Sequence, residues 1–361
     1  MTYSQLPPIG NLQASKQRLH YCAQQNLLKH AVAVEFGGLG TTFQELVAAH
    51  FELGKYCQDT GLILSINAHL WGAIFPLLRY GTAAQQQTWL PALLTGDLLA
   101  GHAITEPQAG SDIHLLSTQA TQTESGFILN GHKRFITNAP IADVMVVYAV
   151  LDNKLSAFII KADDLGANFT DTPHVTGCAT ATMGDIILQD CLIPLERQLG
   201  KIGAGNMMIQ SALELERAFI FAGINGIMHW QLQQIIKYSR ERRVENTHLG
   251  SKQAISHKIA DMQLRLDSSK LWVNECARLK DTNKRISLVS AQTKLFASEA
   301  FLQSSLDAVH IMGASGLIAA NKISTLVQDA MASRLFSGSS EIQKNMIAAL
   351  LGTGTGYKSK S

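Results

Sequence analysis

The sequence predicts a mostly helical α+β protein in which one β region separates two helical regions. Its 361 residues, 46% of them hydrophobic, are enough to bury a core several layers thick. Apolar residues recur at three- and four-residue spacing in the first and last parts of the chain, whereas short β-branched runs fill the middle. We expect a helical domain at 1–101, a β domain at 102–200, a helical bundle at 201–351 and a disordered tail at 352–361.

The first helical region runs from about Asn11 to Gly96. Its amphipathic segments read LQASKQRLHYCAQQNLLKHA, FQELVAAHFELGKYC and QQTWLPALL. Gly37, Gly38 and Gly40 stand between the first and second segments, where they are expected to break the helix.

The β region extends from His102 to about Arg197. Its runs FILN, RFIT, VMVVYAV, AFIIKA and DIIL are separated by turn residues. Asn130-Gly131 accepts the positive φ angles of a two-residue hairpin, so we expect the run before it to pair with the run after it. Pro194 marks the exit from this region.

Long helical patterns return from about Gly205. They include NMMIQSALELERAFIFAGINGIMHW and ISHKIADMQLRLDSSKLWVNECARL. The closing GTGTGYKSKS is small, polar and glycine-rich, so it cannot bury enough surface to order itself.

Charge and composition exclude several kinds of partner. The formal net charge is +2 with scattered basic residues, which gives no reason to expect nucleic acid or an anionic membrane. Since we find no uninterrupted apolar run of membrane-span length and no leader-like start, we expect a soluble, cytoplasmic protein. The cysteines stand far apart without a C-x-x-C pair, so neither a disulfide framework nor a metal site is expected.

A polar, glycine-bearing turn at 103–112 lies where helical segments give way to strands. The backbone N–H groups and hydroxyls of such turns can bind a phosphate or a ring carbonyl. Alternatively, Pro107 and Gly110 only shape a tight connection and bind no ligand. The residues of this turn leave both interpretations open.

Six short motifs follow one another along the chain. They are EFGGLG at 35–40, TEPQAGSD at 105–112, NGHKRFITN at 130–138, ERR at 241–243, QAI at 253–255 and GSSEIQ at 338–343. In this order they resemble the motifs of the acyl-CoA dehydrogenases over nearly the whole chain. The resemblance implies an N-terminal helical domain, a central β domain and a C-terminal four-helix bundle.

The same resemblance implies FAD as the cofactor, between the β domain and the bundle. The matching β-domain residues are Ile104, Thr105, Gly110, Ser111, Phe135 and Thr137. The first two match the pyrimidine edge of the flavin, and Ser111 matches the pyrophosphate. Phe135, where tryptophan is common, and Thr137 would flank the ring. Without the family, Phe135 would be interpreted as a core residue.

A further group of matches implies an oligomer. Arg242 matches an arginine that binds the FAD pyrophosphate of a neighbouring subunit, and Gln253, His310 and Gly313 match further contacts across that interface. The family commonly has glutamine in place of His310 and an aromatic residue in place of Glu245, so this end of the site departs from the pattern. The resemblance implies a homodimer or homotetramer.

Dehydrogenation of an acyl thioester needs a carboxylate base, which the family places at one of two positions. The commoner position is Ser337 in this chain, and a serine hydroxyl cannot serve unaided. The other lies in the L-x-L-E-R pattern of the isovaleryl-CoA dehydrogenase branch, which here makes Glu216 the base. Alternatively Glu216 is an ordinary helix-surface carboxylate, and Glu214 can pair with Arg217.

The resemblance also assigns supporting roles around the substrate. The backbone N–H of Ser337 would hold the thioester carbonyl oxygen, and Glu214 and Arg217 would lie at the substrate, Glu214 at its pantetheine arm. Ser339 and Glu341 match nearby flavin or pyrophosphate contacts.

Three functions remain open at this point. The first is α,β-dehydrogenation of a short or branched acyl-CoA, with electrons passing to an electron-transfer flavoprotein or to oxygen. The second acts on an acyl or aminoacyl group, such as prolyl, that is bound to a carrier protein. The third is a catalytically silent flavoprotein, suggested by Ser337, Glu245 and His310.

Overall fold

The computed structural model describes residues 3, 5–171 and 175–354. The chain forms two compact units. The first unit is drawn from Met1–Thr42, Leu64–Val175 and Thr180–Glu216. The second unit is drawn from Phe43–Ile63, Thr176–Ala179 and Arg217–Ser361. Helices occupy both ends of the chain and strands the middle, so the predicted helical, β, helical order is confirmed. The domain boundaries stay predictions, and most of the predicted tail lies outside the described residues.

The first unit carries the N-terminal helices. They are α1 (Leu12–Gln24), most of α3 (Thr60–His69), a π-helical segment (Leu70–Ile74), α4 (Phe75–Tyr80) and α5 (Ala83–Thr95). Thr82 and Gln85 begin α5 with a reciprocal capping box, each side chain bonding the other's backbone N–H. Gly37 and Gly40 adopt φ angles of 86° and 63° in the connection to the next helix, but α1 already ends at Gln24, so these glycines do not end it.

The most apolar helical segment of the described chain is Thr60–Tyr80. It is long and apolar enough to cross a membrane by length and composition, with a mean hydropathy of 1.6, although Ser65, Asn67 and His69 interrupt its apolar residues. In the structure, 89% of its most apolar 18-residue stretch is buried. A helix that is apolar all round and buried is typical of a protein core.

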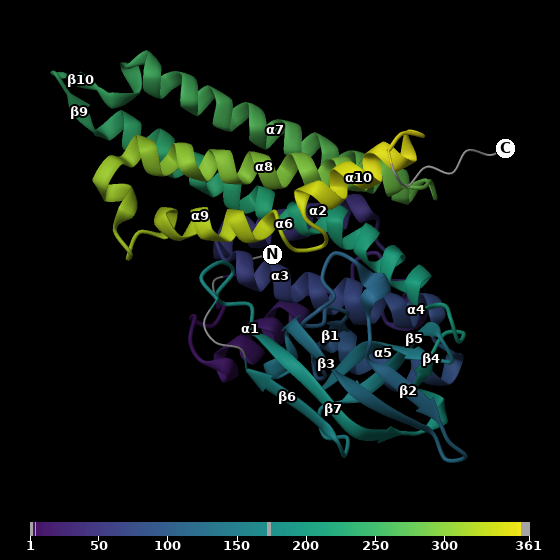
Figure 1. The fold of residues 1–361 in the computed structure, drawn as a ribbon. Helices are drawn as coiled ribbons and strands as arrows, with labels where there is room; N and C mark the ends of the chain where they lie inside the picture. Colours follow the sequence, from purple (N-terminus) through teal and green to yellow (C-terminus); the bar gives the residue numbers. More distant parts are fainter. Residues whose placement is uncertain (1–2, 4, 172–174, 355–361) are drawn as a thin grey trace. The chain divides into compact units, whose positions relative to one another are not determined.

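An eight-stranded sheet forms the rest of the first unit (Figure 1). Its strands are β1 (Ala100–Ala103), β2 (Gln119–Gln122), β3 (Phe127–Thr137), β4 (Val144–Leu151), β5 (Lys154–Lys161), β6 (Ala167–Asp171), β7 (Met183–Ile193) and β8 (Gln198–Leu199). The order is β6-β7-β3-β2-β4-β5-β8, with β1 parallel to β4. One face buries a shared core in which the rings of Phe127 and Phe158 lie 5.1 Å apart.

The predicted hairpin at Asn130-Gly131 is wrong, because both residues lie inside the single strand β3. The Asn130 side chain bonds across to Asp190 of β7, accepting from its N–H at 2.8 Å and donating to its carboxylate at 3.1 Å. A Cβ at Gly131 would lie 2.4 Å from the Thr118 hydroxyl. The glycine therefore permits the close approach of Thr118, which directly precedes β2, rather than a turn.

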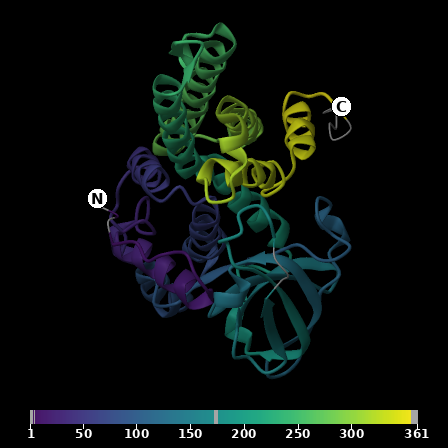
Figure 2. The same cartoon turned by 90° about the vertical axis from the view of Figure 1, so that its left-hand side faces the viewer.

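Helices make up most of the second unit. They are α2 (Phe43–Cys57), the later part of α6 (Gly205–Glu241), α7 (Gln253–Asp281), α8 (Ser287–Met312), α9 (Lys322–Ser333) and α10 (Ser340–Leu350), with the short strands β9 (Arg243–Val244) and β10 (Thr247–His248). α7 and α8 lie side by side in both views (Figures 1 and 2). A Cβ at Gly54 would lie 1.8 Å from the Gly223 carbonyl oxygen, so glycine is required where α2 crosses α6.

Candidate functional site

The turn at 103–112 is built around a buried ion pair. Lys133 Nζ donates to Glu106 Oε1 at 2.7 Å and to the Ile104 carbonyl at 3.1 Å. Burial acts to raise the pKa of Glu106, but the Lys133 ammonium and several N–H and O–H donors lower it to about 2. Burial lowers the pKa of Lys133 to about 8 against the opposing charge of Glu106. Glu106 therefore fixes this turn against β3.

The predicted flavin contacts of the β region all belong to the first unit. They are Ile104, Thr105, Gly110, Ser111, Phe135 and Thr137. Gly110 and Ser111 are exposed, and a Cβ at Gly110 would find no heavy atom within 4 Å. The packing of the chain does not require this glycine, so the space beside its backbone is open to a ligand.

Phe135 is half exposed and has a φ of 56°. Its N–H donates to Asp185 Oδ1 at 3.3 Å, and the Arg134 guanidinium carbon lies 4.9 Å from its ring centroid. The interpretation of Phe135 as a core residue is wrong, since the neighbouring Ile136 fills the core instead. An exposed aromatic ring, with the hydroxyl-bearing Thr137 two residues further along the chain, suits a planar, partly polar ring system. The first unit therefore fits a flavin.

Glu216 on α6 is a buried carboxylate, with only 4% of the residue exposed. The interpretation of Glu216 as a surface residue is therefore wrong. Its Oε2 lies 3.6 Å from Nε2 of His102 on β1. Burial lowers the pKa of His102, while the charge of Glu216 acts in the opposite direction. The sequence did not suggest His102, because one histidine in a short strand carries no periodic or spacing signal.

Ser337 lies in a turn whose carbonyl groups are fixed. Arg217 Nε donates to the Ser337 carbonyl at 2.9 Å, and Gln343 Nε2 donates to the same carbonyl at 3.2 Å and to that of Gly338 at 2.9 Å. Ser337 has a φ of 54°. The structure thus gives Arg217 a role in shaping this turn. Its contact with substrate, and that of the partly exposed Glu214, stay predictions.

The residues predicted to reach a neighbouring subunit lie at one end of the second unit. They are Arg242, Gln253, His310 and Gly313, all exposed. Tyr238 Oη donates to the Met312 carbonyl at 3.3 Å, which joins the ends of α6 and α8. Lys258 Nζ lies 2.8 Å from Asp307 Oδ1, and this ion pair joins the first part of α7 to the last part of α8. The short strands β9 and β10 extend from this end (Figure 1).

Ser339 and Glu341 have local roles at the start of α10. The Ser339 hydroxyl accepts from the Ile342 N–H at 3.4 Å as the N-cap. Glu341 stands exposed in the first helical turn, where a carboxylate is favourable. Their predicted cofactor contacts stay predictions.

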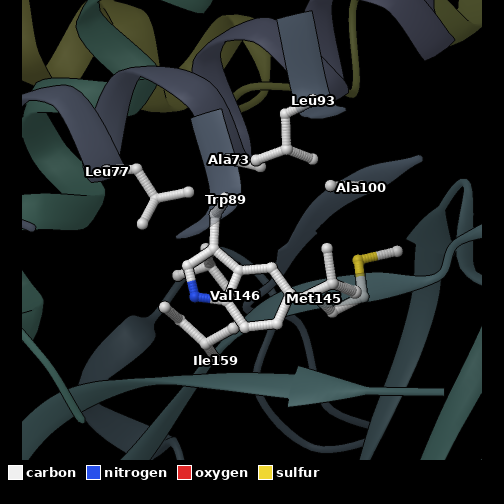
Figure 3. A pocket seen from close by; sticks show the side chains of 9 residues that line it. Ala73, Leu77, Trp89, Leu93, Ala100, Met145, Val146 and Ile159 are labelled. Carbon is white, nitrogen blue, oxygen red and sulfur yellow. The ribbon is translucent and has the colours of Figure 1, made fainter. Parts of the chain in front are cut away.

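A small pocket in the first unit is apolar throughout (Figure 3). It is lined by Ala73, Leu77, Trp89, Leu93, Ala100, Val144, Met145, Val146 and Ile159. The Trp89 indole lies between the helical side chains and the strands, and no predicted site residue lines the space. Within residues 3, 5–171 and 175–354, no group of three or more His, Cys, Asp or Glu side chains could hold a metal ion.

Family models match almost the entire chain. The N-terminal, middle and C-terminal domains of acyl-CoA dehydrogenase match residues 11–97, 101–191 and 203–352. The predicted family resemblance is therefore confirmed, as is the predicted fold class.

Similar proteins include one that acts on a carrier-bound amino acid and others solved as structures. The L-prolyl-[peptidyl-carrier protein] dehydrogenase of Pseudomonas fluorescens is 34% identical over 333 residues, or 91% of this chain and 88% of that protein. The prolyl acyl carrier protein oxidase AnaB superposes with a TM-score of 0.91 and 34% identity, over 93% of this chain and 90% of that one. The FAD complex of PigA superposes with a TM-score of 0.90 and 31% identity, over 95% of this chain and 90% of that one.

Proposed function

Because this chain belongs to the acyl-CoA dehydrogenase family, we propose that it is an FAD-dependent α,β-dehydrogenase of an acyl thioester. Glu216 takes the α-proton of the substrate. The observation that carries this proposal is the burial of Glu216, a carboxylate on α6 with 4% exposure. Ser337, at the alternative position for the base, offers only a hydroxyl.

The cofactor in this proposal is FAD, which accepts a hydride from the β-carbon when bound. Ile104, Thr105, Gly110, Ser111, Phe135 and Thr137 would hold it. Open space beside Gly110 and the half-exposed Phe135 ring support this assignment. The name of the PigA complex, a protein 31% identical to this one, supports it as well.

The residues of the chain divide the remaining work. The Glu216 carboxylate receives the proton in a buried position, where water does not compete for it. The Ser337 N–H donates to the thioester carbonyl oxygen and so stabilises the negative charge that develops there. Bonds from Arg217 and Gln343 to the Ser337 carbonyl fix the orientation of the turn that carries this donor.

The thioester carrier is CoA or a carrier protein. The family name points to CoA, whereas the names of two similar proteins, each 34% identical, point to prolyl groups on a carrier protein. We favour a small acyl or aminoacyl group on a carrier protein, with prolyl as the first substrate to test. Short and branched acyl-CoAs are the second candidates.

We also propose a cytoplasmic homodimer or homotetramer that passes electrons to an electron-transfer flavoprotein or to oxygen. The exposed side chain of Arg242 supports the oligomer, since a guanidinium can reach phosphate oxygens of a cofactor bound by a neighbouring copy. The exposed Gln253 lies at the same end of the second unit.

The test is an anaerobic flavin-reduction assay on the FAD-loaded protein. A panel of acyl-CoAs is compared with the same acyl and aminoacyl groups on a carrier protein, and the visible flavin absorbance is followed. Bleaching by the carrier-bound prolyl group supports the favoured substrate, and bleaching by CoA esters alone assigns the protein to the CoA branch. If no thioester bleaches the flavin, the protein is a silent flavoprotein and the proposed activity is rejected.

A further inference from the structure

His102 faces the helices of the first unit rather than the core of its sheet. The next residue on β1, Ala103, belongs to the sheet core, and alternate residues of a strand point to opposite faces. The His102 side chain is only 12% exposed, and its Nε2 lies 3.6 Å from Glu216 Oε2. The imidazole and the carboxylate therefore meet inside the unit, away from bulk water.

Gly72 leaves room for the imidazole in this position. It lies in the π-helical segment Leu70–Ile74, a type of helical irregularity that is frequent at functional sites. A Cβ at Gly72 would lie 2.8 Å from His102 Cγ and 3.1 Å from its Cδ2. Any side chain at residue 72 would therefore push the ring, so the helix and the histidine fit each other only with glycine here.

The backbone of β1 is fixed two residues before His102. The Ala100 N–H donates to His69 Nδ1 at 2.9 Å, and the Ala100 carbonyl accepts from Asn138 Nδ2 at 3.0 Å. His69 in turn bonds the Leu93 carbonyl through Nε2 at 2.9 Å. Two buried side chains thus hold the strand that directs His102 toward Glu216, and one of them, His69, is itself fixed to α5.

The imidazole has one ring nitrogen available to the carboxylate. Burial lowers the pKa of His102, which favours the neutral ring with a single N–H. Nδ1 of His102 has no hydrogen-bond partner among the described residues, whereas Nε2 faces the Glu216 oxygen. A proton on Nε2 therefore places a donor in front of an acceptor. The 3.6 Å separation is longer than a hydrogen bond, and catalytic contacts of this kind tighten when substrate binds.

We propose that His102 is a positioning residue for Glu216, whose Nε2–H holds one carboxylate oxygen so that the other faces the α-proton of the substrate. This inference rests on the proposed role of Glu216 as the base. Its physical basis is that misplacing a reacting group by about 1 Å can cost on the order of 100-fold in rate. His102 touches neither the transferred proton nor the hydride and acts only through Glu216.

Two substitutions separate positioning from simple packing. His102→Leu fills the space but removes the N–H, so we expect kcat to fall by about 10- to 100-fold with FAD content and KM unchanged. His102→Gln restores an N–H donor and should recover much of kcat. The matched control is His20→Leu, because His20 lies in the same unit but contacts the Gly96 carbonyl and Gln24. This control should leave kcat unchanged.

A second measurement does not depend on turnover. In protein labelled with 15N-histidine, the His102 imidazole signal is assigned by its loss in His102→Gln. At neutral pH we expect the neutral tautomer with its proton on Nε2, and a clear change of that signal in Glu216→Gln. A histidine that serves only packing would not respond to this isosteric change.

The inference is overturned if His102→Leu turns over as fast as the wild type, or if Nδ1 carries the proton. It is also overturned if the His102 imidazole signal is the same in Glu216→Gln as in the wild type. The two proposals can fail separately. If the imidazole responds to Glu216→Gln but no thioester reduces the flavin, the pairing of the two side chains stands and the proposed activity fails. If thioesters reduce the flavin but His102→Leu is fully active, the activity stands and the positioning role fails.

Discussion

Lys133 Nζ lies 2.7 Å from Glu106 Oε1, and both side chains are almost fully buried. Removing one partner of such a pair leaves a buried charge without compensation. We expect Lys133→Met to lower the free energy of unfolding by about 3–5 kcal/mol. The double variant Lys133→Met/Glu106→Gln should recover part of this loss. Urea unfolding at constant FAD concentration measures both, and an unchanged midpoint for Lys133→Met would contradict the structural role of the pair.

The pKa of His69 is lowered, chiefly by burial, and this predicts how stability depends on pH. In the folded state the ring is neutral and accepts from the Ala100 N–H, whereas the unfolded chain takes up a proton near pH 6.5. The unfolded state therefore binds more protons below that pH, and the folded protein loses stability as the pH falls. His69→Gln has no titrating ring, so its unfolding free energy should change less between pH 7 and pH 5 in urea titrations. If the unfolding free energies of the wild type and His69→Gln change equally between pH 7 and pH 5, His69 does not contribute to the pH dependence of stability.

Much of the fold could be predicted because local patterns determine it. Three- and four-residue apolar spacing marked the helices, and β-branched runs marked the strands β3, β4, β5 and β7. The Asn130-Gly131 hairpin failed because the local preference of that dipeptide for a turn yielded to pairing of β3 with β7 and to the close approach of Thr118. Tertiary contacts of this kind leave no mark in the local sequence.

The candidate site was predictable only in part, for the same reason. The family motifs identified Glu216 and Phe135, and the structure shows the first buried and the second half exposed. The contact between His102 and Glu216 joins residues far apart in the sequence. The bond from Arg217 to the Ser337 carbonyl likewise depends on how α6 packs in the second unit, which periodicity does not encode.

The half-exposed ring of Phe135 predicts a direct effect on cofactor binding. If it covers the flavin, Phe135→Ala should weaken FAD binding by about 10-fold, the size expected for one aromatic contact. Phe135→Trp should bind FAD as well as the wild type. The control is Leu165→Ala, because Leu165 is 87% exposed and has no predicted role. Titration of the apoprotein with FAD, followed by flavin fluorescence, gives each affinity, and equal binding by Phe135→Ala and the wild type would remove Phe135 from the site.

The Ser337 turn predicts that a backbone group matters more than a side chain. Ser337→Ala keeps the N–H, so its kcat should stay within the same order of magnitude as that of the wild type. Arg217→Met removes the charged donor that holds the Ser337 carbonyl, and its kcat should fall further. Steady-state assays with the best substrate compare the two variants. Loss of turnover in Ser337→Ala would mean that the hydroxyl takes part in the reaction.

The central claim is that Glu216 is the base, and anaerobic rapid mixing of Glu216→Gln with substrate tests it most directly. The variant should bind FAD and substrate like the wild type, while the rate of flavin bleaching falls by at least about 100-fold, the lower range for loss of a general base. Flavin reduction by Glu216→Gln at the wild-type rate would contradict the account and would mean that another residue is the base.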